Sequence, residues 1–228
     1  MSVYITGDKH GELGLIDLVN WSEGKNLSKD DYLIIAGDFG GLFYGSSKDE
    51  KILQFYENQP YTTLFIDGNH ENFDLLESYP VEEWHGGKIH RISPSIIHLM
   101  RGQIFYFEGH SIFTMGGATS TDRGMRINKK SWWSRELPAY EEYLEADDNL
   151  AKHNNKVDYI VTHCCSARQY YRFSGCGLSG FYHDPLTDYF DEIERQVKFT
   201  HWWYGHWHDD INVDSEHTMI TRKIIKII

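Results

Sequence analysis

Five short runs of β-branched and aromatic residues constrain the fold of this chain most, because each run stops at a turn residue or a histidine. The runs are Val3–Thr6, Tyr32–Ala36, Thr62–Ile66, Tyr159–Thr162 and Phe199–Tyr204. Apolar runs of this length, bounded by turn residues, are typical of strands buried inside a sheet. The sequence therefore predicts five buried strands.

The stretches between these runs predict helices and hairpins. Apolar spacing typical of helices occurs in Leu13–Glu23, Lys48–Asn58, Asn72–Ser78, Ala139–His153 and Asp188–Gln196. A hairpin is predicted from Ile104–Phe107 and Ser111–Met115, and a further hairpin or edge strand from Thr218–Ile228. Strands that alternate with helices first and with hairpins later indicate an α/β fold of mixed sheets covered by helices. Because no repeat or linker divides the 228 residues, we expect a single domain over residues 1–228.

The charge of the chain limits its partners. It has 34 acidic and 22 basic residues, which give a formal charge of −12. A field of this sign repels long polyanions, so long nucleic acid is disfavoured as a partner. A small phosphorylated substrate is compatible with this charge, because bound metal ions reverse its sign locally.

The cysteines and the hydropathy of the chain indicate in which cellular compartment the protein is expected. The three cysteines, Cys164, Cys165 and Cys176, form neither a disulfide framework nor a CxxC pair. No apolar run reaches the roughly 20 residues that cross a bilayer, and the N-terminus lacks the pattern of a leader peptide. We therefore expect a cytoplasmic protein without a membrane partner.

Side chains that bind metals follow all five predicted strands. They are Asp8 and His10, Asp38, Asn69 and His70, His163, and His206 and His208. Each group alone would more often be an ordinary turn or a structural histidine. In open α/β sheets, however, ligands gather beyond the carboxyl ends of the strands, and five such groups in succession favour a shared metal site. A mixed set of Asp, Asn and His suits divalent ions, so we expect two of them, Mn in the first place and Fe or Zn as alternatives.

The order of these motifs resembles the signature of the calcineurin-like metallophosphoesterase superfamily. The matching segments are Gly7-Asp8-Lys9-His10-Gly11, Gly37-Asp38, Gly68-Asn69-His70-Glu71, His163 and Gly205-His206-Trp207-His208. The resemblance implies a four-layer αββα sandwich of two mixed β-sheets flanked by helices. It implies that one metal is bound by Asp8, His10 and His208, the other by Asn69, His163 and His206, and both by Asp38. It also implies that a hydroxide bridging the metals attacks phosphorus while His70 protonates the leaving oxygen as general acid.

Two departures disfavour the protein Ser/Thr phosphatases of this superfamily. Those enzymes carry Arg before Gly-Asn-His-Glu, where this chain has Asp67. They also carry an Asp-Arg pair after the second Gly-Asp, where this chain has Phe39-Gly40-Gly41-Leu42. The arginines that would hold a phosphoprotein are therefore missing, and the carboxylate expected to orient His70 is replaced by Gly41.

Other arginines can supply the phosphate contacts. Arg123 ends a Gly/Ser/Thr-rich loop that follows a predicted strand, and Arg168 and Arg172 follow His163 in the segment Cys164–His183. Loops in such positions often determine specificity. We expect Arg123, Arg168 and Arg172 to bind substrate.

The sequence favours an enzyme that hydrolyses a phosphomonoester or phosphodiester of a small or nucleotide-like molecule. A nuclease acting on single-stranded ends is one alternative, which the charge of −12 disfavours. A non-catalytic metal-binding scaffold with the same fold is another, which the complete ligand set disfavours. The preference for monoesters or diesters and the oligomeric state stay open at this stage.

Overall fold

Two β-sheets form the centre of the molecule in the computed structural model, which describes residues 1–175 and 183–228; Cys176 lies outside the described residues. The first sheet has the strand order β13-β1-β2-β3-β6-β5-β4. Its strands are β1 (Val3–Thr6), β2 (Tyr32–Ala36), β3 (Thr62–Ile66), β4 (Val81–Trp84), β5 (Gly87–Ser93), β6 (Ile96–Leu99) and β13 (Ile225–Lys226). Strands β1, β2, β3 and β6 run parallel, whereas β4, β5 and β13 pair antiparallel with their neighbours.

The second sheet has the strand order β11-β12-β10-β9-β8-β7. Its strands are β7 (Gln103–Phe107), β8 (His110–Met115), β9 (Tyr159–Thr162), β10 (His201–Tyr204), β11 (Ile211–Asn212) and β12 (His217–Met219). Strands β8, β9, β10 and β12 are parallel, and β7 and β11 are antiparallel edge strands. Both sheets are therefore mixed.

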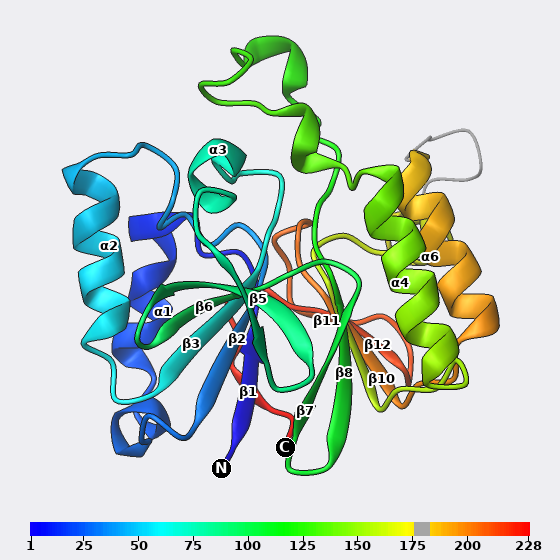
Figure 1. Cartoon of the computed structure of the whole chain (residues 1–228), viewed down its shortest axis with the longest axis horizontal. Helices are drawn as coiled ribbons and strands as arrows, with labels where there is room; N and C mark the ends of the chain where they lie inside the picture. The colour runs from blue at the N-terminus through cyan, green and yellow to red at the C-terminus, as the bar shows by residue number, and fades with distance from the viewer. Residues whose placement is uncertain (176–182) are drawn as a thin grey trace.

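Helices cover the outer face of each sheet (Figure 1). On the side of the first sheet these are α1 (Leu15–Asn20) and α2 (Ser47–Glu57), and on the side of the second sheet α4 (Tyr140–Lys152) and α6 (Pro185–Gln196). The short helix α3 (Phe73–Leu76) and the segment with two 3₁₀ turns, Arg123–Met125 and Ser134–Glu136, lie above the sheets. Helix α5 (Ala167–Ser174) packs against α6. The expected four-layer αββα arrangement is confirmed.

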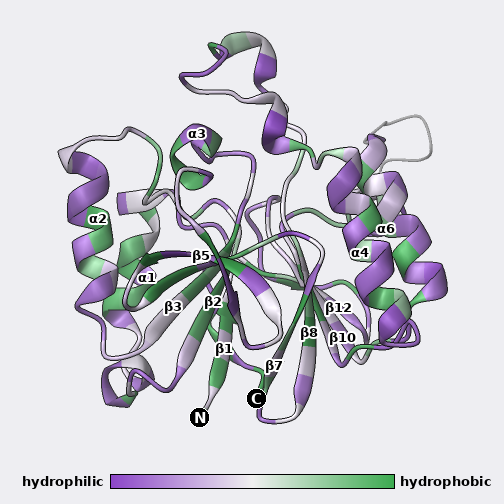
Figure 2. Ribbon diagram, in the orientation of Figure 1, coloured by the Kyte–Doolittle hydropathy of each residue, from purple (hydrophilic) through white to green (hydrophobic). Residues whose placement is uncertain are grey.

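Three apolar clusters fill the three spaces between these four layers, and strand β2 shows how. Ile34 and Ala36 belong to the cluster between the two sheets, with Phe105 and Val161 of the second sheet. Leu33, next to Ile34, points to the opposite cluster, which lies under α2. Successive residues of a strand face opposite sides of a sheet, so a strand with both faces covered has to be apolar throughout. Figure 2 shows this as hydrophobic strands between helices whose outer faces are hydrophilic.

The five strands and the hairpin predicted from the sequence are present, with β10 starting two residues later than expected, at His201. The helix predicted for Leu13–Glu23 is divided into a 3₁₀ turn, α1 and a second 3₁₀ turn. The tail Thr218–Ile228 does not pair with itself, because β12 joins the second sheet and β13 the edge of the first. Strands β4 to β6 and helix α5 were not predicted. None of the described helices combines the length and apolarity needed to cross a membrane.

Candidate metal centre

The predicted metal ligands converge beyond the ends of five strands, three from the first sheet and two from the second. Ligating atoms of Asp8, His10, Asp38 and His208 all lie within 4.8 Å of one another. Nε2 of His10 is 2.9 Å from Nε2 of His208 and 3.5 Å from Oδ2 of Asp38. These four side chains form a group that can hold a cation.

The remaining predicted ligands lie on the other side of Asp38. Nε2 of His163 is 3.4 Å from Oδ2 of Asp38 and 3.1 Å from Oδ1 of Asn69. The rings of His163 and His206 have their centres 5.0 Å apart. The same oxygen of Asp38 therefore faces His10 on one side and His163 on the other, the position expected for a ligand shared by two metals.

The backbone is strained at these positions. Four of the predicted ligands, His10, Asp38, His206 and His208, have φ between 45° and 70°. This left-handed conformation is uncommon for residues with a side chain, and it persists only where the surrounding structure enforces it. In this tight loop the backbone N–H of His206 donates to Asp8, and Nε2 of His208 lies 3.8 Å from Oδ1 of Asp8.

Glycines next to the ligands allow close approach between the sheets. A Cβ on Gly37 would lie 2.1 Å from the His163 ring, and one on Gly205 would lie 2.4 Å from a carboxylate oxygen of Asp8. Neither position has room for a larger residue. Because Gly37 and Asp8 belong to the first sheet and His163 and Gly205 to the second, these contacts join the two sheets at the site.

Outer contacts orient the ligand side chains. Nδ1 of His163 donates to the carbonyl of Ala36 over 2.8 Å, which leaves Nε2 to face the cluster. The amide nitrogen of Asn69 donates to Oγ of Ser120 over 3.1 Å, and that hydroxyl donates to Glu136 over 2.5 Å. This chain of contacts directs Oδ1 of Asn69 inward. Fixed outer partners of this kind are typical of metal ligands.

The electrostatics fit divalent cations. Burial raises the pKa of Asp8 to about 7 and lowers the pKa of His10 to about 4. Burial would raise the pKa of Asp38 too, but the charge and hydrogen bond of His163 lower it, and Asp38 in turn raises the pKa of His163 to about 10. Two buried carboxylates close together repel each other and are stabilised by positive charge. A divalent ion would supply that charge in place of protons.

His70 lies at the edge of this cluster, with its ring centre 4.9 Å from that of His10. Its backbone N–H donates to Oδ1 of Asp38 over 2.8 Å. Nη2 of Arg126 is 2.5 Å from its Nε2, and Nε of Arg126 pairs with Asp122 at 2.6 Å. Burial lowers the pKa of His70, and the charge of Arg126 acts in the same direction. Arg126 therefore contacts His70, and Asp122 pairs with Arg126. The motifs in the sequence contain no carboxylate that would orient this ring.

The contacts observed for the three predicted substrate arginines do not involve the ligand cluster, and their part in substrate binding stays a prediction. Arg123 is exposed, with its guanidinium 4.0 Å from the ring centre of Trp132. Arg168 and Arg172 line a separate hollow of 340 Å³, where Arg172 pairs with Asp214. Arg126, in the same segment as Arg123, is the arginine that reaches His70. Sequence reasoning missed it because a position in an irregular loop carries no periodic signal.

Asp67, which replaces the arginine of the protein phosphatases, is buried in an ion pair. Both Nε and Nη2 of Arg101 contact its Oδ2, at 2.9 and 2.6 Å, and Nε2 of His98 lies 3.2 Å from Oδ1. Arg101 also contacts Glu142 of α4 at 3.1 Å. This network holds the loop that carries Asn69 and His70 against the second half of the chain.

Comparisons with known proteins agree with this geometry. The sequence model of the family described as calcineurin-like phosphoesterase matches residues 1–210. A lariat debranching enzyme of Danio rerio is 27% identical over an alignment that covers 51% of this chain and 22% of that protein, so the chain spans less than a quarter of its relative.

A solved structure, the phosphopantetheinyl hydrolase from Mycobacterium tuberculosis, has a TM-score of 0.48 with 14% identity over 96% of this chain and 88% of its own. That likeness is too weak to add to the fold described above. The family match extends from before Asp8 to beyond His208 and so includes every predicted metal ligand. The chain belongs to the calcineurin-like phosphoesterase family.

Proposed function

We propose that this protein is a metal-dependent hydrolase of small phosphoesters, with two divalent ions, Mn in the first place, bound between its sheets. The observation that carries the proposal is the position of Asp38, whose Oδ2 lies 3.5 Å from His10 and 3.4 Å from His163. Asp8, His10 and His208 would hold one ion with Asp38, and Asn69, His163 and His206 the other. Ions bound there would acidify a water for attack on phosphorus and neutralise the phosphate.

His70 is proposed to give the leaving oxygen its proton. When water attacks phosphorus and the P–O bond breaks, the departing oxygen gains negative charge that a proton neutralises. The ring of His70 borders the ligand cluster but is not needed to complete it. A phosphate dianion beside the ring would favour its protonated form, opposing the burial that lowers its pKa.

Arg126, rather than Arg123, is proposed to hold a phosphate oxygen. Its guanidinium contacts both ring nitrogens of His70, at 2.5 and 3.2 Å, and its Nη1 lies 3.4 Å from the carbonyl of Asn69. Guanidinium groups bind phosphate in a bidentate manner. The pair with Asp122 holds Arg126 over the site before substrate arrives.

The charge of −12 favours a small phosphorylated substrate over a single-stranded nucleic acid end. Binding of a short fluorescent oligonucleotide that weakens steeply with added salt would instead favour the nuclease.

The test is turnover of a panel of phosphomonoesters and diesters by the Mn-loaded protein, alongside its metal content. We expect hydrolysis that a chelator removes and Mn restores. The variant His70→Ala should keep its metal and lose more activity on substrates with poor leaving groups than on activated nitrophenyl esters, because only the former need the proton. Equal losses on both kinds would exclude the general acid, and bound metal without turnover on any ester would favour the scaffold.

A further inference from the structure

A groove of 360 Å³ opens beside the metal centre. His10 and His70 line it, together with residues from the loops after β1 and β2 and from α2. The lining residues are His10, Gly11, Glu12, Leu13, Gly40, Phe43, Tyr44, Lys48, Ile52 and His70. Because His10 and His70 line it, any ester held at the metals has part of its structure in or next to this groove. The volume lies in the range of small-molecule sites.

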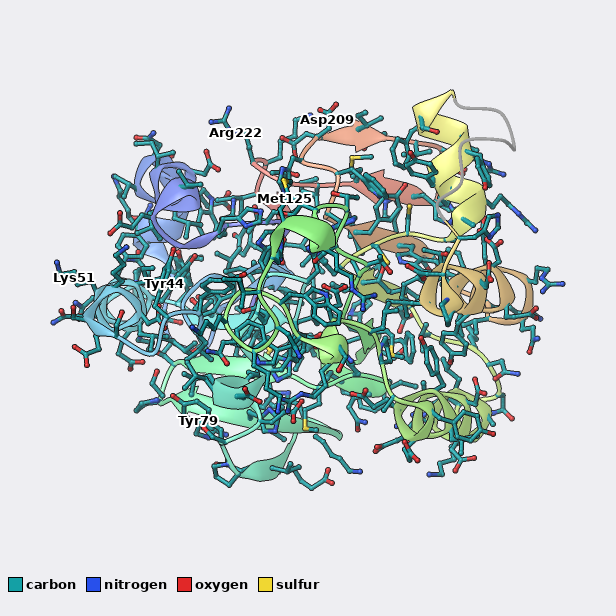
Figure 3. The ribbon with its side chains drawn as sticks, turned by 90° about the horizontal axis from the view of Figure 1, so that it is seen from above. Tyr44, Lys51, Tyr79, Met125, Asp209 and Arg222 are labelled. Atoms are coloured by element: carbon teal, nitrogen blue, oxygen red, sulfur yellow. The ribbon has the colours of Figure 1, made fainter. Side chains whose placement is uncertain are left out.

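Phe43 and Tyr44 form an aromatic wall of the groove. The rings of Phe43 and Tyr44 meet edge to face with centres 5.1 Å apart. Tyr44 is 59% exposed, and the ammonium of Lys48 lies 4.7 Å from its ring centre. Figure 3 shows Tyr44 between α2 and the middle of the face on which Met125 lies. An exposed ring on this face offers area for stacking.

This wall is rigid, although it belongs to a loop. Oδ2 of Asp49 accepts hydrogen bonds from the backbone N–H groups of Phe43, Tyr44 and Gly45, at 3.0, 2.8 and 2.7 Å. The amide of Asn72 donates to the carbonyl of Phe43 over 3.0 Å. Asp49 is buried. The aromatic surface is therefore in place before a ligand arrives, which lowers the entropy lost on binding.

We propose that this groove binds the base of a nucleotide whose phosphate lies at the metal centre, an inference that rests on the proposed function and names its substrate class. A planar base stacks on Tyr44, as bases do on aromatic side chains in nucleic-acid-binding proteins. Glu12 can accept hydrogen bonds from an exocyclic amine, and Lys48 can donate to a ring nitrogen or carbonyl. An acyl chain would use neither of these charged groups. Stacking tolerates any base, so the groove selects nucleotides without choosing among them.

The experiment compares two probes that differ only in the base. Binding of AMP and of ribose 5-phosphate, each as its non-hydrolysable phosphonate analogue, to the Mn-loaded protein is measured by calorimetry. The wild type should bind AMP about tenfold more tightly than ribose 5-phosphate, the size expected for one stacked base. Tyr44→Ala should abolish that ratio and leave the affinity for ribose 5-phosphate unchanged, whereas Tyr44→Phe should preserve the ratio.

Tyr140→Ala is the matched control, because Tyr140 is an exposed tyrosine at the start of α4, outside the groove. It should bind both probes as the wild type does. Equal affinity of the wild type for the two probes, or equal weakening of both by Tyr44→Ala, would overturn the nucleotide groove. Failure of the proposed hydrolysis is seen separately, as absence of turnover, since the binding ratio needs no reaction.

Discussion

The two sheets contribute different chemistry to the metal centre. The ends of β1, β2 and β3 in the first sheet supply both carboxylates, Asp8 and Asp38, and the amide of Asn69. The ends of β9 and β10 in the second sheet supply only imidazoles, namely those of His163, His206 and His208. Among the predicted ligands, His10 is the one imidazole that follows a strand of the first sheet. Neither layer by itself contains all seven predicted ligands.

The contacts at the site cross from one sheet to the other. The backbone N–H of His206 donates to both carboxylate oxygens of Asp8 at 3.0 Å, and His163 donates to Ala36. The apolar cluster between the sheets lies directly beneath, with Ala36 and Val161 on its two sides. Metal binding and the packing of the sheets should therefore depend on each other, because the ligand geometry exists only when the layers meet.

The largest effect is expected from removing one ligand on either side. Asp38→Asn takes away the oxygen shared by the two groups, and His163→Ala takes away an imidazole of the second sheet. Each should abolish hydrolysis and lower the bound metal, measured by elemental analysis of the dialysed protein. His153→Ala, at the C-terminal end of α4, is the control and should keep both. Full metal content in His163→Ala would show that this imidazole of the second sheet is not needed to hold the ions.

A smaller effect is expected from pushing the sheets apart at the site. The Cβ of Gly205→Ala would lie 2.4 Å from Asp8 and 2.9 Å from the carbonyl of Ala36, so β10 has to move. We expect a loss of metal affinity of about 10- to 100-fold, the size seen when ligand orientation is disturbed. Gly124→Ala, which meets no atom within 4 Å, should leave the affinity unchanged. Equal affinity in both variants, measured by Mn titration, would argue against close packing as the source of the geometry.

The smallest effect on the metal centre is expected from the ion pair of Asp67 with Arg101, whose loss should act on stability instead. Burial alone would raise the pKa of Asp67, but Arg101 and His98 lower it below its ordinary value. Since the folded state prefers the carboxylate, its stabilisation is complete above the unfolded pKa near 4 and is lost as the pH falls below that value. Arg101→Met should lower the free energy of unfolding at pH 7 by about 3–5 kcal/mol, because it leaves a buried charge with less compensation.

The control for that pair is Arg91→Met, which breaks a half-exposed contact with Glu82. The free energy of unfolding should fall by less than about 1 kcal/mol in this variant. Urea unfolding at several pH values measures both variants. The difference between Arg101→Met and the wild type should shrink below pH 4, because Asp67 of the variant, which lacks Arg101, takes up a proton there and loses its unpaired charge. A constant difference down to pH 2 would show that lost packing of Arg101, and not its charge, sets the cost.

The buried strands at the centre of the two sheets were predictable because a run of apolar residues is a pattern of neighbouring residues. An apolar run such as Thr62–Ile66 followed by Gly68-Asn69 predicts both a buried strand and a ligand at its end. The edge strand β4 escaped prediction because Val81–Trp84 is short, contains two glutamates and is only partly buried. The role of Arg126 was not predicted, for a different reason. Its contact with His70 spans 56 residues and depends on where a loop without periodicity folds back.

The sequence by itself determined the buried strands, the mixed sheets covered by helices and the chemical nature of the predicted ligands, because strand periodicity and donor type are properties of neighbouring residues. The four-layer order followed from the family resemblance. Only the tertiary structure decided which arginine reaches the site, what surrounds His70 and where the groove with Tyr44 opens. Those features come from loops whose paths are determined by contacts between residues distant in the chain. The contact of Arg126 with His70 and that of Asn72 with the carbonyl of Phe43 are of this kind, and nothing in the local sequence marks either pair as part of a site.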